Sequence, residues 1–458
     1  MPRPGGPREV VVVVTFEREA VNDRLSDTAA GCWLLAAGCW DDVGVARSVP
    51  RRSFLSMTAV AGLTLVSSVA VTGCTTFPRA FRSSGTRCDP RTAAEVVPDA
   101  GALFGVNLDW GHQTLQDYAS LLGRKPAVAV VFADIPLNTH DREDVNAAAE
   151  QVRGEGGTLL LTLEPQKGLE PVTDRVADDI AALVNGIQQN GVPVIVRFAH
   201  EMNGSWYPWG QQPNAYVAAF RRVAGALRSG APGSATMWAP NEGGGYPFAG
   251  GPSAAVAGTP AFDVLDTDGD GVLTARDDPY TPYYPGDDVV DWVGLSIYLW
   301  GAAAPWGANV LPEEGKFAAK LTGTYNGAGG DETAVPDFYD LFGVRRNKPV
   351  AIPETAALVV PRGDADGELA IKKAWWSQVF SAETAAAFPN VRMINWFEWD
   401  KYETEVHEQV DWTVTNDPTT RDAFVEALPG WLHFAAAPEH CRTAESGARP
   451  EGTERLDS

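Results

Sequence analysis

Two glutamates that each follow a short apolar strand are the residues of this chain best suited to chemistry. Glu201 follows the β-branched segment 194–199, and Glu354 follows a second apolar segment, 350–352. The loop after Glu201 contains three large aromatic residues, Trp206, Tyr207 and Trp209. A pair of carboxyl groups can supply a proton donor and a nucleophile, and aromatic rings stack on the faces of sugars. The pattern predicts cleavage of a glycosidic bond; the alternative is a barrel strand with a surface acid after it.

Both segments resemble the catalytic strands of glycoside hydrolase family 26, the β-mannanase family. The resemblance covers about residues 100–415 and includes two further segments, 283–298 and 395–401. It implies that Glu201 is the acid/base residue and Glu354 the nucleophile of a retaining mechanism. In such a mechanism the two carboxyl groups lie about 5–5.5 Å apart. The glutamates are distant in sequence, so only the fold can bring them together.

The resemblance also implies roles for residues around the glutamate pair. Tyr298 would hydrogen-bond the nucleophile, and Trp396 would form the floor of the −1 sugar subsite, with packing inside the barrel as the alternative. His200 would contact the substrate or orient the site, unless it is a structural histidine, and Trp206 would contact the sugar. Many mannanases of the family have Asp two positions before the equivalent of Tyr298, where this chain has Ser296. Substrates other than mannan therefore stay open.

Arg197 is expected to bind substrate or to act on the charge of the site. It stands four residues before Glu201, and strand alternation directs both side chains toward the barrel interior. A cation there would favour the ionised form of Glu354 while Glu201 stays protonated in a drier position. An interior ion pair without catalytic effect is the alternative.

The spacing of apolar residues predicts the elements that position these side chains. Strands are expected at 103–106, 127–132, 158–163, 194–199, 236–239, 289–298, 350–352 and 393–396. Helices are expected at 142–152, 176–189 and 214–228. This alternation predicts an α/β fold of the (β/α)8 TIM-barrel type. All strands of such a barrel open onto one face at their C-terminal ends, where an acid after the fourth strand and a nucleophile after the seventh would meet.

Residues 266–277 match the calcium-binding loop of an EF-hand. Acidic residues occupy positions 1, 3, 5 and 12, a glycine position 6 and an aliphatic residue position 8. The expected oxygen ligands are Asp266, Asp268, Asp270, the carbonyl of Val272 and Asp277, with Thr274 acting through water. The loop falls between the fifth and sixth strands, so a structural Ca²⁺ on a cleft loop is expected, with no cofactor in the chemistry. A solvated acidic turn is the alternative.

The segment 49–74 resembles a bacterial Tat-type lipoprotein signal. The pair Arg51-Arg52 precedes the apolar run 56–72, which ends close to Cys74. We therefore expect export, with the protein extracellular or held at the cell surface by a lipid on Cys74. A transmembrane helix, or cleavage after an alanine that releases a free enzyme, are the alternatives.

The remaining boundaries follow from composition. Residues 1–48 stand before the signal and are expected not to belong to the native protein, and residues 75–98 read as a linker. The catalytic domain would cover 99–435, and 436–458 would form a disordered tail. Of five cysteines, Cys88 and Cys441 would remain at the two ends of the barrel, apart from Cys74 and the two in the leader, Cys32 and Cys39. They would pair in an oxidising compartment, or stay as two free thiols.

Composition limits the partners. A formal net charge of −23 argues against nucleic acid and anionic membranes, and favours neutral or cationic polysaccharides over acidic ones. The 45% hydrophobic content suffices for the core of one large domain, expected to be a monomer. We expect a retaining endo-β-1,4-mannanase. Hydrolysis of β-1,3-xylan or mixed-linkage β-glucan, and a non-catalytic carbohydrate-binding lipoprotein, are the alternatives.

Overall fold

The computed structural model describes residues 92–361 and 365–436. The expected leader, signal segment and tail lie outside the described residues, apart from position 436. So do all five cysteines and most of the expected linker. The structure therefore bears on the expected barrel domain.

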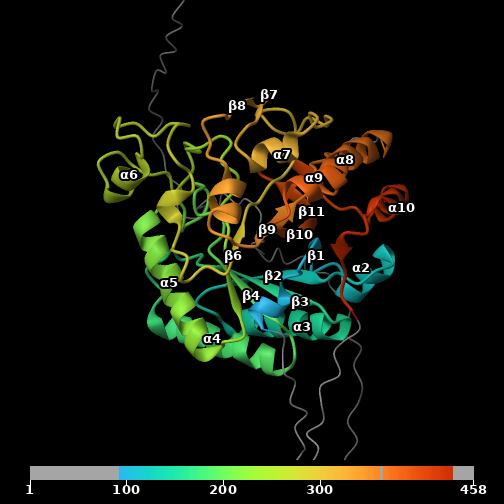
Figure 1. Cartoon of the computed structure of the whole chain (residues 1–458), viewed down its shortest axis with the longest axis horizontal. Helices are drawn as coiled ribbons and strands as arrows, with labels where there is room; N and C mark the ends of the chain where they lie inside the picture. Colours follow the sequence, from blue (N-terminus) through green and yellow to red (C-terminus); the bar gives the residue numbers. More distant parts are fainter. Residues whose placement is uncertain (1–91, 362–364, 437–458) are drawn as a thin grey trace, which may run out of the picture. The chain divides into compact units, whose positions relative to one another are not determined.

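Eight parallel strands close into a barrel (Figure 1). They are β1 (Ala102–Leu108), β2 (Val128–Asp134), β3 (Thr158–Glu164), β4 (Val194–Phe198), β5 (Ala235–Trp238), β6 (Trp292–Gly294), β9 (Val350–Thr355) and β10 (Val391–Glu398). Each strand pairs with the next in chain order, and β10 pairs with β1 to complete the ring. A two-residue strand, β13 (Leu432–His433), adds to β1 from outside the ring. The predicted TIM-barrel architecture is confirmed.

Helices surround the strands. The larger ones are α2 (Leu115–Leu122), α3 (Thr139–Glu155), α4 (Asp174–Gln189), α5 (Pro213–Gly230), α8 (Ala365–Val379) and α10 (Pro418–Ala427). In Figure 1, α3, α4 and α5 lie near β2 to β4, and α8 and α10 lie near β10. The apolar residues of α4 recur on one helical face, and the Thr173 side chain caps its first turn. The three expected helices each fall within an observed one.

Shorter elements occupy the loops and the ends. They are α1 (Ala93–Val96), α6 (Pro260–Leu265), η1 (Thr281–Tyr283), α7 (Lys316–Leu321), η2 (Tyr339–Val344) and α9 (Ala382–Ala387). Two small hairpins join β7 (Asn326–Gly327) with β8 (Gly330–Asp331) and β11 (Asp400–Glu403) with β12 (Glu408–Asp411). The loops after β5, β6 and β10 therefore contain secondary structure of their own, and each begins at the C-terminal end of a barrel strand.

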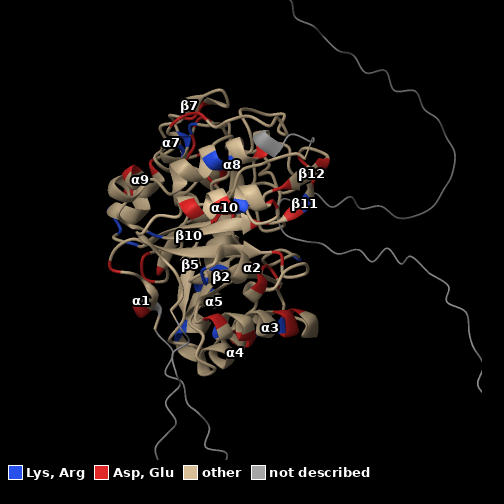
Figure 2. Ribbon diagram, turned by 90° about the vertical axis from the view of Figure 1, so that its right-hand side faces the viewer, with Lys and Arg blue, Asp and Glu red and all other residues tan. Residues whose placement is uncertain are grey.

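Strand alternation divides the core into two parts. Inside the ring, apolar side chains from every second residue pack together, among them Val130, Leu160, Ile195 and Met393. The other set packs between the strands and the helices. Figure 2 shows acidic and basic residues on α3, on α4 and on the loops. Within the described ranges, no helix is long and apolar enough to cross a membrane.

The sixth strand is shorter than the sequence predicts. The expected strand spanned 289–298, but the regular strand covers only Trp292–Gly294. Beyond it the chain makes isolated bridges at Ser296 and Leu299. Residues 295–297 are nevertheless buried between β9 and the chain after β5. The Leu295 amide donates to the Ala351 carbonyl of β9, and the Ser296 amide donates to the Pro240 carbonyl.

Candidate active site

The turn after β4 presents Glu201 at the mouth of the barrel. The strand ends at Phe198, and both Ala199 (φ 46°) and Glu201 (φ 53°) take left-handed backbone conformations. Such conformations are strained for residues other than glycine and occur mainly at functional positions. The Glu201 amide donates to the Ala239 carbonyl at 2.8 Å, and the Gly204 amide donates to the Glu201 carbonyl at 2.9 Å. These bonds hold the strained turn against the end of β5.

The Glu201 carboxyl lies in a buried, mostly neutral environment. Only 5% of the residue is exposed. Asn241 donates its side-chain amide to Oε1 at 3.0 Å, and the Trp206 indole donates to Oε2 at 3.2 Å. Burial, and after it the negative charge of Glu354, raise the pKa of Glu201 to about 7. This carboxyl is thus protonated at mildly acidic pH and can donate a proton.

The Glu354 carboxylate has the opposite environment. It ends the inner face of β9, is fully buried, and forms an ion pair with the Arg197 guanidinium. The Tyr298 hydroxyl donates to its other oxygen at 2.5 Å. Charge-assisted bonds of this kind favour the ionised form of a carboxyl group. Glu354 is therefore oriented at the barrel mouth by a cation on one oxygen and a phenol on the other.

Arg197 connects three strands of the barrel. Besides the Glu354 pair, its Nε donates to Thr162 Oγ1 on β3 at 3.0 Å. The guanidinium carbon lies 5.5 Å from the ring centroid of Phe132 on β2. The structure thus places Arg197 beneath the nucleophile as an interior ion pair. In this position it acts on the charge of Glu354.

His200 is fully buried next to the acid. Its Nε2 lies 3.2 Å from the Tyr207 hydroxyl, and its ring contacts Phe132 edge-on. Burial, with the nearby charge of Arg197, lowers the pKa of His200 well below 6.5, so the ring is neutral. Its Nδ1 has no hydrogen-bond partner among the residues that the structure describes. That atom is free for a ligand or a water molecule.

The three aromatic residues of the β4 loop have different roles. Trp206 stays partly exposed and packs edge-on against Phe248 at 5.0 Å between ring centroids. Tyr207 and Trp209 are fully buried and stack on each other at 4.3 Å. Of the three, only Trp206 is placed to meet a sugar. The other two support His200 from behind.

The position of Trp396 corrects the expectation for the −1 floor. Trp396 lies on the outer side of β10, where its ring contacts Phe380 and Phe424. It therefore packs in the core between the strands and the helices, and not inside the barrel. The next residue, Phe397, has the opposite orientation, and its ring lies 5.7 Å from that of Tyr298. Trp412, from the loop after β12, lies 5.3 Å from Tyr298. Phe397 and Trp412 are the aromatic residues that flank the Tyr298–Glu354 pair.

Sequence reasoning missed several polar residues of this site. Asn241 follows β5, and Thr162 and Glu164 belong to β3. Each is at or near the C-terminal end of a barrel strand, the criterion that identified Glu201 and Glu354. Applied to every strand, that criterion would have found them.

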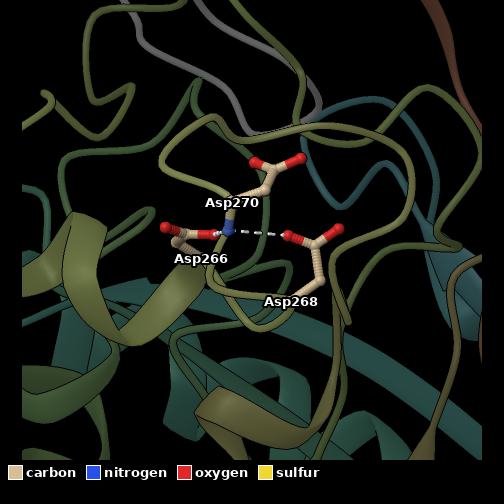
Figure 3. Close-up of side chains that lie close together, drawn as sticks. All are labelled: Asp266, Asp268 and Asp270. Carbon is tan, nitrogen blue, oxygen red and sulfur yellow. Dashed lines mark hydrogen bonds between the residues drawn. The ribbon is translucent and has the colours of Figure 1, made fainter.

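The acidic loop 266–277 lies between β5 and β6, as predicted, and three of its side chains converge (Figure 3). Asp266, Asp268 and Asp270 each offer an oxygen within 4.8 Å of the others. Asp266 also accepts hydrogen bonds from the amides of Asp270 and Gly271, at 3.1 and 2.9 Å. Three carboxylates around one point supply the hard oxygen ligands that Ca²⁺ prefers.

Asp277, the expected ligand at position 12, does not join the three. It is fully buried, and its two oxygens accept the amides of Thr267 at 2.7 Å and Thr274 at 2.8 Å. In this arrangement the carboxylate closes the loop on itself. The side chain of Val272, whose carbonyl was expected to bind the ion, is largely exposed.

The chain is similar to known proteins in sequence and in structure. Residues 162–238 match the model of glycosyl hydrolase family 26. Endoglucanase H of Acetivibrio thermocellus is 23% identical over 324 residues, which cover 69% of this chain and 29% of that protein. The chain thus spans less than a third of the length of this relative.

Two solved structures show how far the likeness in coordinates extends. A modular endo-β-1,4-mannanase from Cellulomonas fimi is 19% identical, with 78% of this chain and 81% of that chain covered, at a TM-score of 0.49. A β-mannanase of family 26 from Bacteroides ovatus is 16% identical, with 78% and 95% covered, at a TM-score of 0.46.

Proposed function

We propose that the chain is a member of glycoside hydrolase family 26 and a retaining enzyme that cleaves internal β-1,4 bonds of mannan. The observation behind this proposal is the contrast between two buried carboxyl groups at one barrel mouth. Glu201 has neutral partners and a raised pKa, whereas Glu354 has a guanidinium and a phenol as partners. Pairs of carboxyl groups in opposite environments are typical of an acid and a nucleophile.

In the first step, Glu354 attacks the anomeric carbon while Glu201 gives its proton to the departing glycosidic oxygen. A bond from carbon to the Glu354 oxygen forms, and the bond to the leaving sugar breaks. Arg197 and Tyr298 keep the attacking oxygen in place. The product is a glycosyl ester on Glu354 and a free sugar end.

In the second step, Glu201 changes from acid to base. The ester on Glu354 is neutral, so the negative charge that raises the pKa of Glu201 has disappeared. The Asn241 bond, which favours the ionised carboxyl, then acts with less opposition. Glu201 can accept a proton from water as the water oxygen bonds to the anomeric carbon. The bond from that carbon to the Glu354 oxygen breaks, which releases the sugar and restores the Glu354 carboxylate. The electrostatics of the pair thus match both steps.

The substrate proposal has one competitor with an observation of its own. The resemblance of the Glu201 and Glu354 segments to β-mannanases favours mannan. The relative named endoglucanase H and the small Ser296 in place of Asp favour a β-glucan. A panel of mannan, β-1,3-xylan, cellulose and mixed-linkage β-glucan, scored by release of reducing ends, decides between them.

Substitution of the two glutamates tests the mechanism. Glu354→Ala should abolish turnover on every glycoside, because no ester can form. Glu201→Ala should lose turnover of polymer but still form the ester from aryl glycosides with activated leaving groups, which need little protonation. Azide should rescue both variants partly and give opposite anomers of the glycosyl azide. Glu170→Ala changes an exposed glutamate and should keep parent activity. Near-parent activity of both active-site variants on polymer would contradict the assignment and favour a binding protein.

We also propose that residues 266–277 bind a structural Ca²⁺. Asp266, Asp268 and Asp270 would hold the ion, with the Val272 carbonyl as a further ligand, while Asp277 closes the loop through the amides of Thr267 and Thr274. The bound ion would neutralise three neighbouring carboxylates and stiffen the loop. Tyr280, just beyond the loop, accepts the Gly243 amide at 2.7 Å, and Gly243 lies two residues after Asn241. The loop thus supports the turn that carries a partner of Glu201.

Export, a lipid on Cys74, a Cys88–Cys441 disulfide and a monomeric state are proposals that rest on the sequence alone. Mass spectrometry of the protein from its native source would detect residues 1–48, the lipid and the disulfide directly. Recovery of peptides from 1–48 would contradict the expected start.

A further inference from the structure

Glu164 is a third carboxyl group at the barrel mouth. It is the last residue of β3, which pairs with β4, and β4 is the strand that precedes Glu201. Leu160 packs inside the ring and Thr162 bonds to Arg197, so alternation directs Glu164 to the same inner face. Only 3% of the residue is exposed, a burial comparable to that of Glu201. Glu164 therefore shares the depth and the orientation of the reacting carboxyls.

The hydrogen bonding of Glu164 is incomplete. Its Oε1 is buried and has no hydrogen-bond partner within residues 92–361 and 365–436. Glu398, another fully buried glutamate, shows what a structural carboxylate looks like here. Its two oxygens accept the amides of Val414 and Thr415 at 3.0 and 2.9 Å. A buried polar group without a partner costs free energy, so a native one has a reason to persist.

The charges around Glu164 place it at the active site. Burial, and after it the charge of Asp134, raise the pKa of Glu164 well above 4.5, and the charge of Glu354 acts in the same direction. Arg197 acts in the opposite direction but forms its ion pair with Glu354. The Glu164 carboxyl is thus neutral, with one O–H to donate and oxygens to accept. It lies within electrostatic reach of the nucleophile.

Other unpaired polar atoms lie on β1, on β4 and in the turn after β4. Arg197 Nη1, His200 Nδ1 and Asn107 Nδ2 are buried without hydrogen-bond partners in the described part of the chain. Phe132 contacts both Arg197 and His200, so these groups border one apolar ring. Donors and a neutral carboxyl beside an aromatic ring match a sugar, which offers several hydroxyl groups and apolar faces.

We propose that Glu164 is a specificity-determining residue that hydrogen-bonds a hydroxyl group of the sugar ring seated over Glu354. The inference rests on the proposed function and adds a third carboxyl to it, one that recognises the ring and takes no part in bond cleavage. A hydroxyl at this position satisfies Glu164, and a ring without that hydroxyl, or with it in another orientation, leaves the buried carboxyl unpaired. Discrimination between β-glycosides follows from that difference.

The proposal is tested by removing the Glu164 carboxyl group from the protein and single hydroxyl groups from the substrate, separately and together. The substrates are 2,4-dinitrophenyl β-mannoside and β-glucoside, each with its 3-, 4- and 6-deoxy forms. The 2-deoxy form is omitted because it changes the reactivity of the anomeric carbon. On the better of the two parent sugars, Glu164→Ala should lose about ten- to a hundredfold in kcat/KM, the value of a hydrogen bond to a carboxyl group. On the one deoxy substrate that lacks the hydroxyl group bound by Glu164, the kcat/KM of Glu164→Ala should equal that of the parent enzyme.

Two more variants separate recognition from structure. Glu164→Gln keeps the volume, one donor and one acceptor, so it should fold if Glu164→Ala does not, and it should retain discrimination within about tenfold. Glu170→Ala changes an exposed glutamate outside the site and should leave discrimination unchanged. Circular dichroism melting checks the fold of all three.

The results that overturn the proposal are distinct from those that overturn the function. If Glu164→Ala, or Glu164→Gln where the alanine variant does not fold, changes every substrate by the same factor, its role is structural or generally electrostatic and the proposal is wrong. Unchanged kcat/KM in the alanine variant has the same consequence. If Glu354→Ala keeps parent activity, or the parent cleaves no β-glycoside, the proposed function is wrong and the Glu164 inference with it.

Discussion

Replacing Asn241 by alanine should raise the pH above which the enzyme loses activity. Asn241 donates to Glu201 Oε1 at 3.0 Å, and this bond favours the ionised carboxyl. Because the first step needs protonated Glu201, kcat/KM should fall as pH rises through its pKa, about 7 in the parent. Without the Asn241 bond the protonated form persists to higher pH, and the alkaline limb moves upward.

The structure sets the size of this shift. A hydrogen bond to a charged group contributes about 1.5–3 kcal/mol, and one pKa unit corresponds to about 1.4 kcal/mol, so the ceiling is about one to two units. Two effects reduce it. The Asn241 amide oxygen can also accept from the neutral carboxyl, and water can enter the space that alanine leaves. We expect an upward shift of about half a unit to one unit, within that ceiling.

The assay is kcat/KM against pH for two aryl glycosides that differ in their leaving groups. With a 4-nitrophenyl or poorer leaving group, protonation matters and the limb reports on Glu201. With 2,4-dinitrophenol, which departs as an anion, the limb should be weak in both proteins. Trp206→Phe removes the other donor to Glu201, at 3.2 Å, and should shift the limb in the same direction. A limb that stays in place or moves down in Asn241→Ala would refute the reasoning.

Three further predictions concern stability. Arg197→Ala leaves buried Glu354 without its cation and should lower the free energy of unfolding in urea by about 3–5 kcal/mol. Adding Glu354→Gln to this variant should recover part of the lost free energy. If the losses of the two single variants simply add, the ion-pair argument is contradicted. Burial raises the pKa of Glu398 from 4.5 to about 7, so its stabilising contribution is complete below pH 4.5 and is lost as pH rises through 7. That loss is about 3 kcal/mol. Glu398→Gln should be less stable overall, but its free energy of unfolding in urea should decline less between pH 5 and 8 than that of the parent protein. A chelator should lower the melting temperature, since a ligand at a hundredfold excess over its Kd adds about 2.7 kcal/mol. Asp268→Ala with Asp270→Ala should melt identically with and without calcium, and equal melting of the parent in both conditions would show a plain acidic turn.

The barrel and its glutamate pair could be predicted because each depends on a local pattern. Short apolar runs separated by helical spacing specify strands, and parallel strands open at one face whatever loops connect them. That is why Glu201 and Glu354 could be assigned to one site from sequence. The length of β6 could not, because residues 295–297 stay buried between β9 and the chain after β5 beyond the end of regular pairing, and an apolar pattern reports only burial.

The orientation of adjacent aromatic residues was beyond the sequence pattern. Trp396 and Phe397 are neighbours, and a strand sends consecutive side chains to opposite faces. Both faces of β10 are buried, one by the barrel interior and one by α8 and α10, so hydrophobicity does not distinguish them. Register against β9 and β1 decides, and register is a property of the closed ring. The same limit applies to Tyr207 and Trp209, which stack in the core while Trp206 stays accessible.

The roles of the carboxyl groups depend on where a single guanidinium lies. Glu164, Glu201 and Glu354 are of one residue type and are similarly buried, and sequence alone gives no reason to separate their chemistry. Arg197 forms its ion pair with Glu354, where Thr162 and the Phe132 ring fix it, and the resulting anion opposes ionisation of the other two. In the proposed mechanism Glu354 is the nucleophile because it has the cation, whereas burial and the charge of Glu354 raise the pKa of Glu164 and of Glu201. Moving the cation by one strand would exchange the roles without changing any glutamate.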